Sequence, residues 1–147
     1  MTEFVKKFTV ATHSEAETLA WAKDFALTLR KGSVVALYGT LGAGKTVVSR
    51  GICAGLGFSG QVNSPTYTIV HEYPNPEIPL YHLDLYRLPP HADLEEIGVD
   101  YYMSQKGVTL IEWPERLEDD SGISHRVTIS VLDGDSREIT VETTSLP

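Results

Sequence analysis

The sequence predicts an α/β domain built on a mixed sheet with a parallel core, helices on both faces and a C-terminal antiparallel hairpin. Two runs, the fully apolar 34–37 and the apolar 108–111 with a single threonine, are typical of strands buried in a parallel sheet. A glycine-rich segment, 39–46, separates the first run from apolar residues at helical spacing. Near the end of the chain, apolar and polar residues alternate in two stretches, 127–131 and 138–142, which is the pattern of a half-exposed hairpin.

Length and composition favour one folded domain spanning residues 1–147. The 147 residues suffice for one hydrophobic core, and the content of 41% hydrophobic and 22% charged residues is typical of a globular protein. No stretch reaches the roughly 18 apolar residues of a membrane span, and residues 1–7 lack the apolar centre of a signal peptide. We therefore expect a cytoplasmic protein that does not bind membranes. The single cysteine, Cys53, excludes an intrachain disulfide and is expected to be buried as an apolar side chain.

The first third of the chain predicts a strand, a helix and then a strand–loop–helix unit. β-Forming residues favour a strand at 4–10. Ser14 and Glu17 have the spacing of a capping box, and the apolar residues after them recur at helical intervals until the helix closes near Gly32. After the glycine-rich segment, helical spacing continues over 47–56.

The middle of the chain predicts short strands and helical pieces separated by proline-rich turns. The expected elements are strands at 67–73 and 80–85, helical segments at 92–97 and 101–105, and the buried strand at 108–111. Residues 134–136 then form the turn of the terminal hairpin.

The glycine-rich segment carries a complete phosphate-binding motif. Gly39, Gly44, Lys45 and Thr46 match the pattern G-x-x-x-x-G-K-[ST], between a predicted strand and a predicted helix. Backbone N–H groups of such a loop surround an anion, and the helix dipole adds positive potential. Lys45 is expected to contact the β- and γ-phosphates, and Thr46 to ligate Mg²⁺. A glycine-rich turn without function is the alternative, but it leaves the flanking strand and helix unexplained, so we predict a P-loop NTPase-like domain.

Two acidic residues follow apolar strands and can complete a nucleotide site. Asp84 follows residues 80–83, near the end of the predicted strand 80–85. Glu112 follows the run 108–111. If both strands run parallel to 34–37, both carboxylates lie at the sheet edge that holds the phosphate loop, where open α/β sheets bind ligands. Carboxylate oxygens suit Mg²⁺. The alternative is that either acid is only a solvated strand end.

Other residues with possible roles carry weaker signals. Thr66 follows Ser64 and Pro65 in the loop after the first βα unit, where a hydroxyl can cover the γ-phosphate as in a switch loop or can simply belong to a turn. Trp113 is either a residue at the edge of the core or an exposed aromatic beside the metal site. The histidines show no paired metal-ligand spacing, and we assign them no role: His13, His71, His82, His91 and His125.

The charge balance argues against independent binding to nucleic acid. The chain carries 20 acidic and 12 basic residues, for a formal net charge of −8. Such a surface repels a polyanion, and no Lys/Arg cluster offsets the repulsion. We therefore expect no DNA binding, and contact with RNA only through a partner.

Four sequence blocks resemble the bacterial TsaE (YjeE) family of small P-loop ATPases. Besides the phosphate loop, they are Ser-Pro-Thr-Tyr-Thr at 64–68, Tyr-His-Leu-Asp-Leu-Tyr-Arg-Leu at 81–88 and Glu-Trp-Pro at 112–114. The phosphate loop alone is common to many proteins, whereas the other three blocks in this order are far more specific. The resemblance extends from the helix start at 14–18 to the final hairpin.

The resemblance implies an activity, cofactors and partners. The family hydrolyses ATP with Mg²⁺, weakly alone and more strongly with partners, and thereby supports formation of threonylcarbamoyladenosine next to the anticodon of tRNA. It acts with the TsaB–TsaD complex, which carries out the transfer chemistry. That division of labour is consistent with the acidic composition, because the partners can hold the tRNA.

The resemblance also implies site residues. Catalytic roles are expected for Asp84, Lys45 and Thr66, and Mg²⁺ ligation for Thr46 and Glu112. The nucleotide-binding residues are expected to be Glu15, Leu41, Gly42, Ala43, Gly44, Lys45, Thr46 and Arg137.

Two departures and two alternatives accompany this prediction. Thr40 stands where the family usually has Asp, and Val47 where a second threonine is common, which bears on the rate of hydrolysis more than on phosphate binding through backbone N–H groups. One alternative is a small-molecule kinase, although the sequence shows no inserted basic lid. The other is an ATP-gated binding module with little hydrolysis, which shares every motif.

Overall fold

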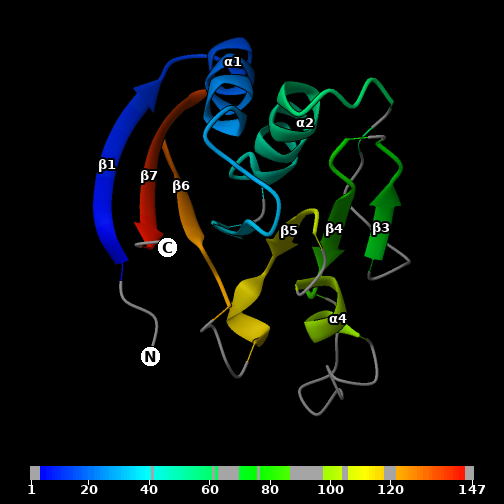
Figure 1. Ribbon diagram of the computed structural model, residues 1–147. Coiled ribbons are helices and arrows are strands. Elements are labelled where there is room, and N and C mark those ends of the chain that lie inside the picture. The colour runs from blue at the N-terminus through cyan, green and yellow to red at the C-terminus, as the bar shows by residue number, and fades with distance from the viewer. Residues whose placement is uncertain are drawn as a thin grey trace.

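The structure, a computed structural model, describes residues 4–40, 42–60, 62, 70–75, 77–86, 98–103, 106–117 and 122–144. Its elements, shown in Figure 1, are β1 (Phe4–Thr12), α1 (Glu15–Ala26), β2 (Val34–Tyr38), α2 (Lys45–Gly55), β3 (Val70–Tyr73), β4 (Leu80–Asp84), α4 (Val99–Met103), β5 (Val108–Glu112), the 3₁₀ turn η1 (Pro114–Arg116), β6 (His125–Asp133) and β7 (Ser136–Thr144).

The seven strands form one mixed sheet in the order β1-β7-β6-β2-β5-β4-β3. The four central strands β6, β2, β5 and β4 are parallel, whereas β3 at one edge and β7 and β1 at the other are antiparallel to their neighbours. The predicted mixed sheet with a parallel core is therefore confirmed. The terminal hairpin is also present, but its first strand is not peripheral, because β6 pairs directly with β2 and so extends the parallel core.

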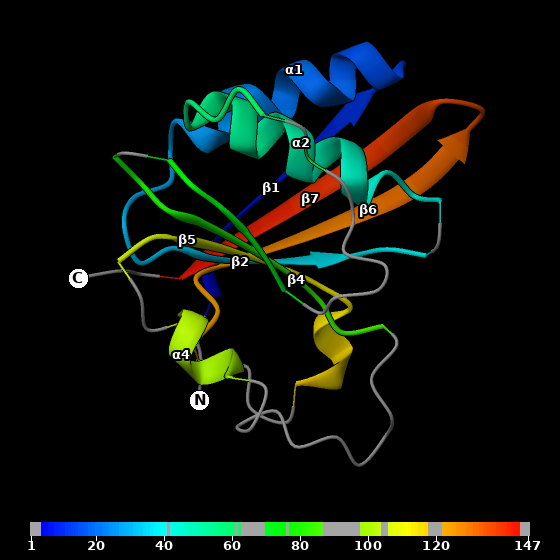
Figure 2. The same cartoon turned by 90° about the vertical axis from the view of Figure 1, so that its right-hand side faces the viewer.

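Helices lie on both faces of this sheet, as predicted. Figure 2 shows α1 and α2 together on one face and the short helix α4 on the other. The side chains of β2 alternate between the two layers: Val35 and Leu37 belong to the core beneath α1 and α2, and Val34 and Ala36 to the core on the α4 side. Burial on both faces explains why the run is apolar without interruption.

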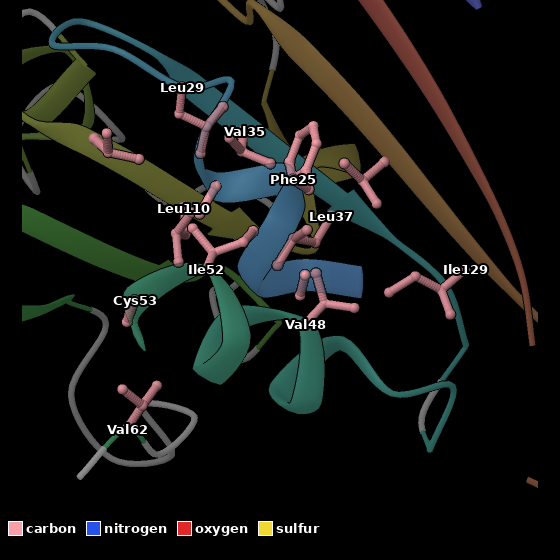
Figure 3. Close-up of a cluster of buried hydrophobic side chains, with 14 of the residues drawn as sticks. Phe25, Leu29, Val35, Leu37, Val48, Ile52, Cys53, Val62, Leu110 and Ile129 are labelled. Carbon is pink, nitrogen blue, oxygen red and sulfur yellow. The ribbon is translucent and has the colours of Figure 1, made fainter. Parts of the chain in front are cut away.

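The larger core lies between the sheet and the two long helices. In Figure 3, Phe25 of α1 and Val48 and Ile52 of α2 converge with strand residues Leu37 and Leu110. Because this layer contains side chains of both β2 and α2, it packs together the two elements that lie before and after the phosphate loop.

The predicted capping-box residues start α1, although Glu17 accepts from the N–H of His13 and not from that of the N-cap residue Ser14. The Glu17 N–H donates to Ser14 Oγ at 3.1 Å, and the His13 N–H donates to Glu17 Oε1 at 3.1 Å. The helix ends at Ala26, earlier than predicted, because the N–H groups of the next residues bond three residues back and tighten the chain into turns. Leu29 is nevertheless buried, which accounts for its place in the helical pattern.

Two glycines let α1 and α2 pack closely. A Cβ on Gly51 would lie 2.5 Å from the Ala22 Cβ, and a Cβ on Gly55 would lie 2.5 Å from the Lys23 carbonyl oxygen. These glycines cost helix propensity. Their presence is therefore explained by the tertiary contact and not by the helix itself.

Some predicted elements lie wholly or partly outside the described residues. The helical segment 92–97 is outside them, as are residues 67–69 of the strand predicted at 67–73, and β3 covers the rest of that strand. The helical piece predicted at 101–105 corresponds to α4, whose bounds are 99–103. Within the described part of the chain, no helix is long and apolar enough to cross a membrane.

Candidate functional site

The phosphate loop leaves the carboxyl end of β2 and ends at the first residue of α2. Gly42 and Gly44 have φ angles of 80° and 113°, which side chains rarely tolerate, so this loop needs glycine at both positions, although only Gly44 is a glycine of the motif. Helix α2 begins at Lys45, and the Val48 N–H donates to the Gly44 carbonyl oxygen at 3.0 Å. The positive end of the helix dipole thus lies at the loop. Leu41, predicted to contact phosphate, lies outside the described residues.

Asp84 and Glu112 end two neighbouring strands at the same sheet edge. The strands β4 and β5 are parallel, and Asp84 pairs with Glu112 in their register. Strand β5 is in turn parallel to β2, with Glu112 opposite Leu37. Both strands therefore run parallel to β2, as the prediction for the two acids required. Both acids lie at the carboxyl ends of the parallel strands, where the phosphate loop also leaves β2.

Lys45 is buried among groups that attract its charge. Its side chain is only 6% exposed, Nζ donates to the Gly39 carbonyl oxygen at 2.8 Å, and Nζ lies 3.6 Å from the centroid of the Trp113 ring. Burial lowers the pKa of the Lys45 ammonium, while the carboxylates of Glu112, Glu115 and Asp84 act in the opposite direction. Lys45 is therefore coupled electrostatically to the acids at the carboxyl ends of β4 and β5.

Trp113 has an unusual backbone that aims its ring at this lysine. Its φ and ψ are 60° and 50°, the left-handed region, and no other described non-glycine residue has a positive φ. Such strain persists only where the surroundings enforce it, and it is frequent at functional sites. The ring also packs against the Tyr86 ring, with centroids 4.6 Å apart, and against the core on the α4 side. Trp113 thus lies partly buried at the edge of the core, as the first alternative predicted, and its ring also covers Lys45.

Asp84 is a carboxyl with raised basicity. Burial raises its pKa and the charge of Glu112 adds to the shift, while the Tyr86 N–H, which donates to Asp84 Oδ1 at 3.0 Å, together with His82 and Lys45, opposes it. A carboxyl that holds a proton more readily than a solvated aspartate suits proton acceptance from water.

His82 lies at the same site, although the spacing of the histidines predicts no role for it. It is fully buried, and its Nε2 lies 2.5 Å from Glu112 Oε2, while the Tyr73 hydroxyl lies 3.1 Å from its Nδ1. Paired metal-ligand spacing does not indicate it, because its partner Glu112 is 30 residues away. A usable signal was its position two residues before Asp84, which puts both side chains on the same face of the strand.

A small cavity lies on the other side of the phosphate loop. Its volume is about 160 Å³, and it is lined by Glu15, Thr18, Gly42, Gly44, Val47, Asp135 and Arg137. Arg137 Nε donates to the Ala43 carbonyl oxygen at 2.7 Å, so the terminal hairpin contacts the loop directly.

Glu15, which lines this cavity, also forms a surface ion pair, with Oε1 3.8 Å from Arg50 Nη1. A larger cavity, about 560 Å³, lies elsewhere, beside Trp21, Phe25 and His125, and includes no residue of the loop.

The acidic groups fit a magnesium site better than a transition-metal site. Among the residues that the structure describes, no group of three or more His, Cys, Asp or Glu side chains could hold a metal. Glu112 and the Thr46 hydroxyl would supply oxygen ligands, and Mg²⁺ usually takes only one or two from protein when it is bound with phosphates. Thr66, the expected switch-loop residue, lies outside the described residues.

The comparisons with known proteins agree on one family. A family model described as threonylcarbamoyl adenosine biosynthesis protein TsaE matches residues 12–139. The chain belongs to the TsaE family. The Bacillus subtilis (strain 168) tRNA threonylcarbamoyladenosine biosynthesis protein TsaE is 39% identical over 137 residues, or 92% of this chain and 85% of that protein. The protein of the same name from Treponema pallidum (strain Nichols) is 39% identical over 132 residues, or 88% and 96%.

A solved structure extends the TsaE likeness to the fold. The crystal structure of Bacillus subtilis YdiB superposes with a TM-score of 0.79 at 34% identity, covering 98% of this chain and 90% of that one. The resemblance that the sequence blocks indicated is therefore confirmed at the level of family and fold. The roles of the individual residues remain predictions.

Proposed function

We propose that this TsaE-family chain binds ATP with Mg²⁺, hydrolyses it, and thereby supports threonylcarbamoyladenosine modification of tRNA next to the anticodon. The observation that carries the proposal is that the phosphate loop, the Lys45 ammonium and the paired acids Asp84 and Glu112 share one edge of the sheet. The pathway comes from the relatives, which are named as tRNA threonylcarbamoyladenosine biosynthesis proteins.

The two ends of ATP have different expected positions. The triphosphate is expected to lie along the loop, where backbone N–H groups, the start of α2 and the Lys45 ammonium supply positive potential. The cavity lined by Glu15 and Arg137 measures about 160 Å³, well below the roughly 300–1,000 Å³ of cavities that enclose drug-sized ligands. We therefore expect it to hold only the adenosine end.

Division of labour among the polar side chains follows from their positions. Thr46 and Glu112 are the proposed ligands of Mg²⁺, which when bound neutralises phosphate charge and polarises the phosphoryl group. Asp84 is proposed to orient the attacking water and accept its proton, in line with its raised pKa. Lys45 is proposed to stabilise charge on the β- and γ-phosphates.

The tRNA is expected to reach this chain only through partners. A formal net charge of −8 opposes contact with a polyanion. We propose that the TsaB–TsaD complex holds the tRNA and docks where Trp113 covers Lys45, beside the proposed nucleotide site. The docked complex would then contact the nucleotide site and respond to whether ATP or ADP is bound there.

An ATP-gated binding module with little hydrolysis is the second candidate. It is favoured by Thr40, which stands in the loop where the family usually has Asp. It uses the same site and differs only in rate.

Three measurements test these proposals together. ATP turnover is measured for the chain alone and with TsaB–TsaD, using Lys45→Ala as the negative control. We expect weak turnover that the partners stimulate. If no turnover occurs in either case, the ATP-gated binding module is the remaining candidate. Restoration of repeated rounds of modification in a reconstituted system lacking TsaE tests the pathway. Tight tRNA binding by the isolated chain in fluorescence anisotropy would contradict the partner route.

A further inference from the structure

A buried chain of hydrogen-bonding groups ends on the proposed magnesium ligand Glu112. The Tyr73 hydroxyl lies 3.1 Å from His82 Nδ1, and His82 Nε2 lies 2.5 Å from Glu112 Oε2. The three residues come from three adjacent strands, β3, β4 and β5. This hydrogen-bonded series therefore extends from the edge strand β3 across β4 to Glu112 on β5, near the phosphate loop.

The direction of the hydrogen bonds follows from the chemistry of the groups. An ionised carboxylate only accepts, so the proton between Glu112 and His82 is carried by Nε2 and donated to Oε2. When the imidazole carries its proton on Nε2 alone, Nδ1 is an acceptor, and the Tyr73 O–H is placed to donate to it. Each group thus fixes the orientation of the next.

His82 is placed to act through Glu112 and not on the nucleotide itself. Its side chain has no exposed surface, whereas Glu112, at 3% exposure, stands at the end of its strand beside Lys45. A buried carboxylate without a donor is costly. The His82 N–H contributes to offsetting that cost and contacts one carboxylate oxygen, and a magnesium ligand needs only one oxygen to bind the metal.

We propose that His82, oriented by Tyr73, is a positioning residue that holds the Glu112 carboxylate in the orientation required for metal binding. This inference rests on the proposed function, because it assumes that Glu112 binds the metal of a metal–nucleotide complex. Outer groups that orient metal ligands commonly contribute about 10- to 100-fold in metal affinity. Their removal leaves metal-free nucleotide binding to the loop and Lys45.

Two substitutions of His82 form a matched pair for the test. His82→Gln and His82→Asn both bury an amide in place of the ring, but only the longer side chain can bring an N–H to the position of Nε2. Tyr73→Phe removes the hydroxyl that faces His82 Nδ1 and that also lies 3.5 Å from His71 Nδ1. His125→Gln is the control, because His125 is also a buried strand histidine, 5% exposed, but contacts Ser124 instead of the site.

The readout is Mn²⁺ affinity, measured by electron paramagnetic resonance in the presence of ADP, together with ADP affinity in EDTA and the thermal unfolding midpoint. We expect His82→Asn to weaken Mn²⁺ binding at least about 10-fold, His82→Gln to recover most of the loss, and Tyr73→Phe to show a smaller loss. ADP affinity in EDTA should stay within about twofold in every variant, and the control should bind Mn²⁺ like the wild type.

The outcomes separate this inference from the proposed function. Wild-type Mn²⁺ affinity in His82→Asn, or equal losses in the Asn and Gln variants, overturns the positioning role while leaving the metal site intact. Should His82→Asn fail to fold, Tyr73→Phe decides, since unchanged Mn²⁺ affinity there contradicts the proposal. Absence of Mn²⁺–ADP binding by the wild type itself overturns the proposed metal site, and the positioning role with it.

Discussion

The Lys45 ammonium lies over the face of the Trp113 ring, with Nζ 3.6 Å from the ring centroid and 2.8 Å from the Gly39 carbonyl oxygen. A cation over an indole face is attracted by the ring quadrupole. Together with the nearby acids, these groups accommodate the buried charge of Lys45. In the proposed function, a triphosphate would therefore compete with groups of the protein for Lys45.

Lys45→Ala should weaken ATP binding by at least about 10-fold, because a hydrogen bond to a charged group contributes about 1.5–3 kcal/mol. The fold should persist, since the core beneath α2 is made by other residues. Isothermal titration with ATP and Mg²⁺ measures the first effect, and thermal unfolding the second. Lys31→Ala, at an exposed lysine, is the control. Unchanged ATP affinity in Lys45→Ala would refute the assignment of the phosphate loop.

Asp84→Asn and Glu112→Gln should differ, because each keeps the shape of the acid while removing its charge. We expect Glu112→Gln to weaken Mg²⁺-dependent nucleotide binding, and Asp84→Asn mainly to lower kcat, by about 10²- to 10⁴-fold if it removes a general base. Steady-state turnover with TsaB–TsaD, measured over a range of Mg²⁺ concentrations, separates the two effects. Wild-type turnover in both variants would mean that neither acid serves the site.

Trp113→Ala should reduce partner-stimulated hydrolysis more than ATP binding. The ring covers Lys45 and packs on Tyr86 at the nucleotide edge, so its loss changes the surface that a docking partner meets. Trp113→Phe keeps an aromatic face over the lysine and should show a smaller effect. ATP affinity and stimulation by TsaB–TsaD are measured on the same preparations. Loss of ATP binding with intact stimulation would make Trp113 a nucleotide or core residue instead.

Stability should fall as the pH is lowered from 6.5 toward 4 because of His125. Burial lowers the pKa of His125 from 6.5 to about 4, and the charge of Arg30 contributes to this shift. Between these two pH values the unfolded chain is therefore protonated at His125 while the folded chain is not. The contribution of His125 to the free energy of unfolding is therefore fully present above pH 6.5, and it declines by about 2–3 kcal/mol as the pH falls to the acid end of this range. Urea unfolding of wild type and His125→Gln at pH 7 and 4.5 checks it. Parallel pH dependences of the two proteins would contradict the assignment.

Gly51→Ala should destabilise the protein even though it improves helix propensity. The gain of about 1 kcal/mol in propensity is opposed by overpacking, which typically costs about 1–3 kcal/mol, because the new Cβ would lie 2.5 Å from the Ala22 Cβ. Urea unfolding gives the net change. Ala54→Gly, at an exposed position of the same helix, measures the propensity contribution alone. A Gly51→Ala protein more stable than the wild type would show that α1 can shift away.

Local patterns were enough to predict the elements whose information is contiguous in the chain. The phosphate loop lies between β2 and α2 as its spacing requires, and the Ser14–Glu17 capping box starts α1. Both depend on hydrogen bonds and side-chain spacing within a few residues. The end of α1 was placed too late because buried Leu29 continues the apolar pattern after the hydrogen bonding has changed.

Contacts across the sheet required the three-dimensional structure. Strand order and register bring Asp84 beside Glu112, place His82 against Glu112 from 30 residues away, and tie Arg137 to the Ala43 carbonyl across 94 residues. The apolar alternation of β6 was visible, but its parallel pairing with β2 was not, because an alternating pattern specifies which face is buried and leaves the neighbouring strand open. Residue spacing thus sufficed for the phosphate loop, whereas the buried polar network beside it exists only because folding aligns strands that are distant in the chain.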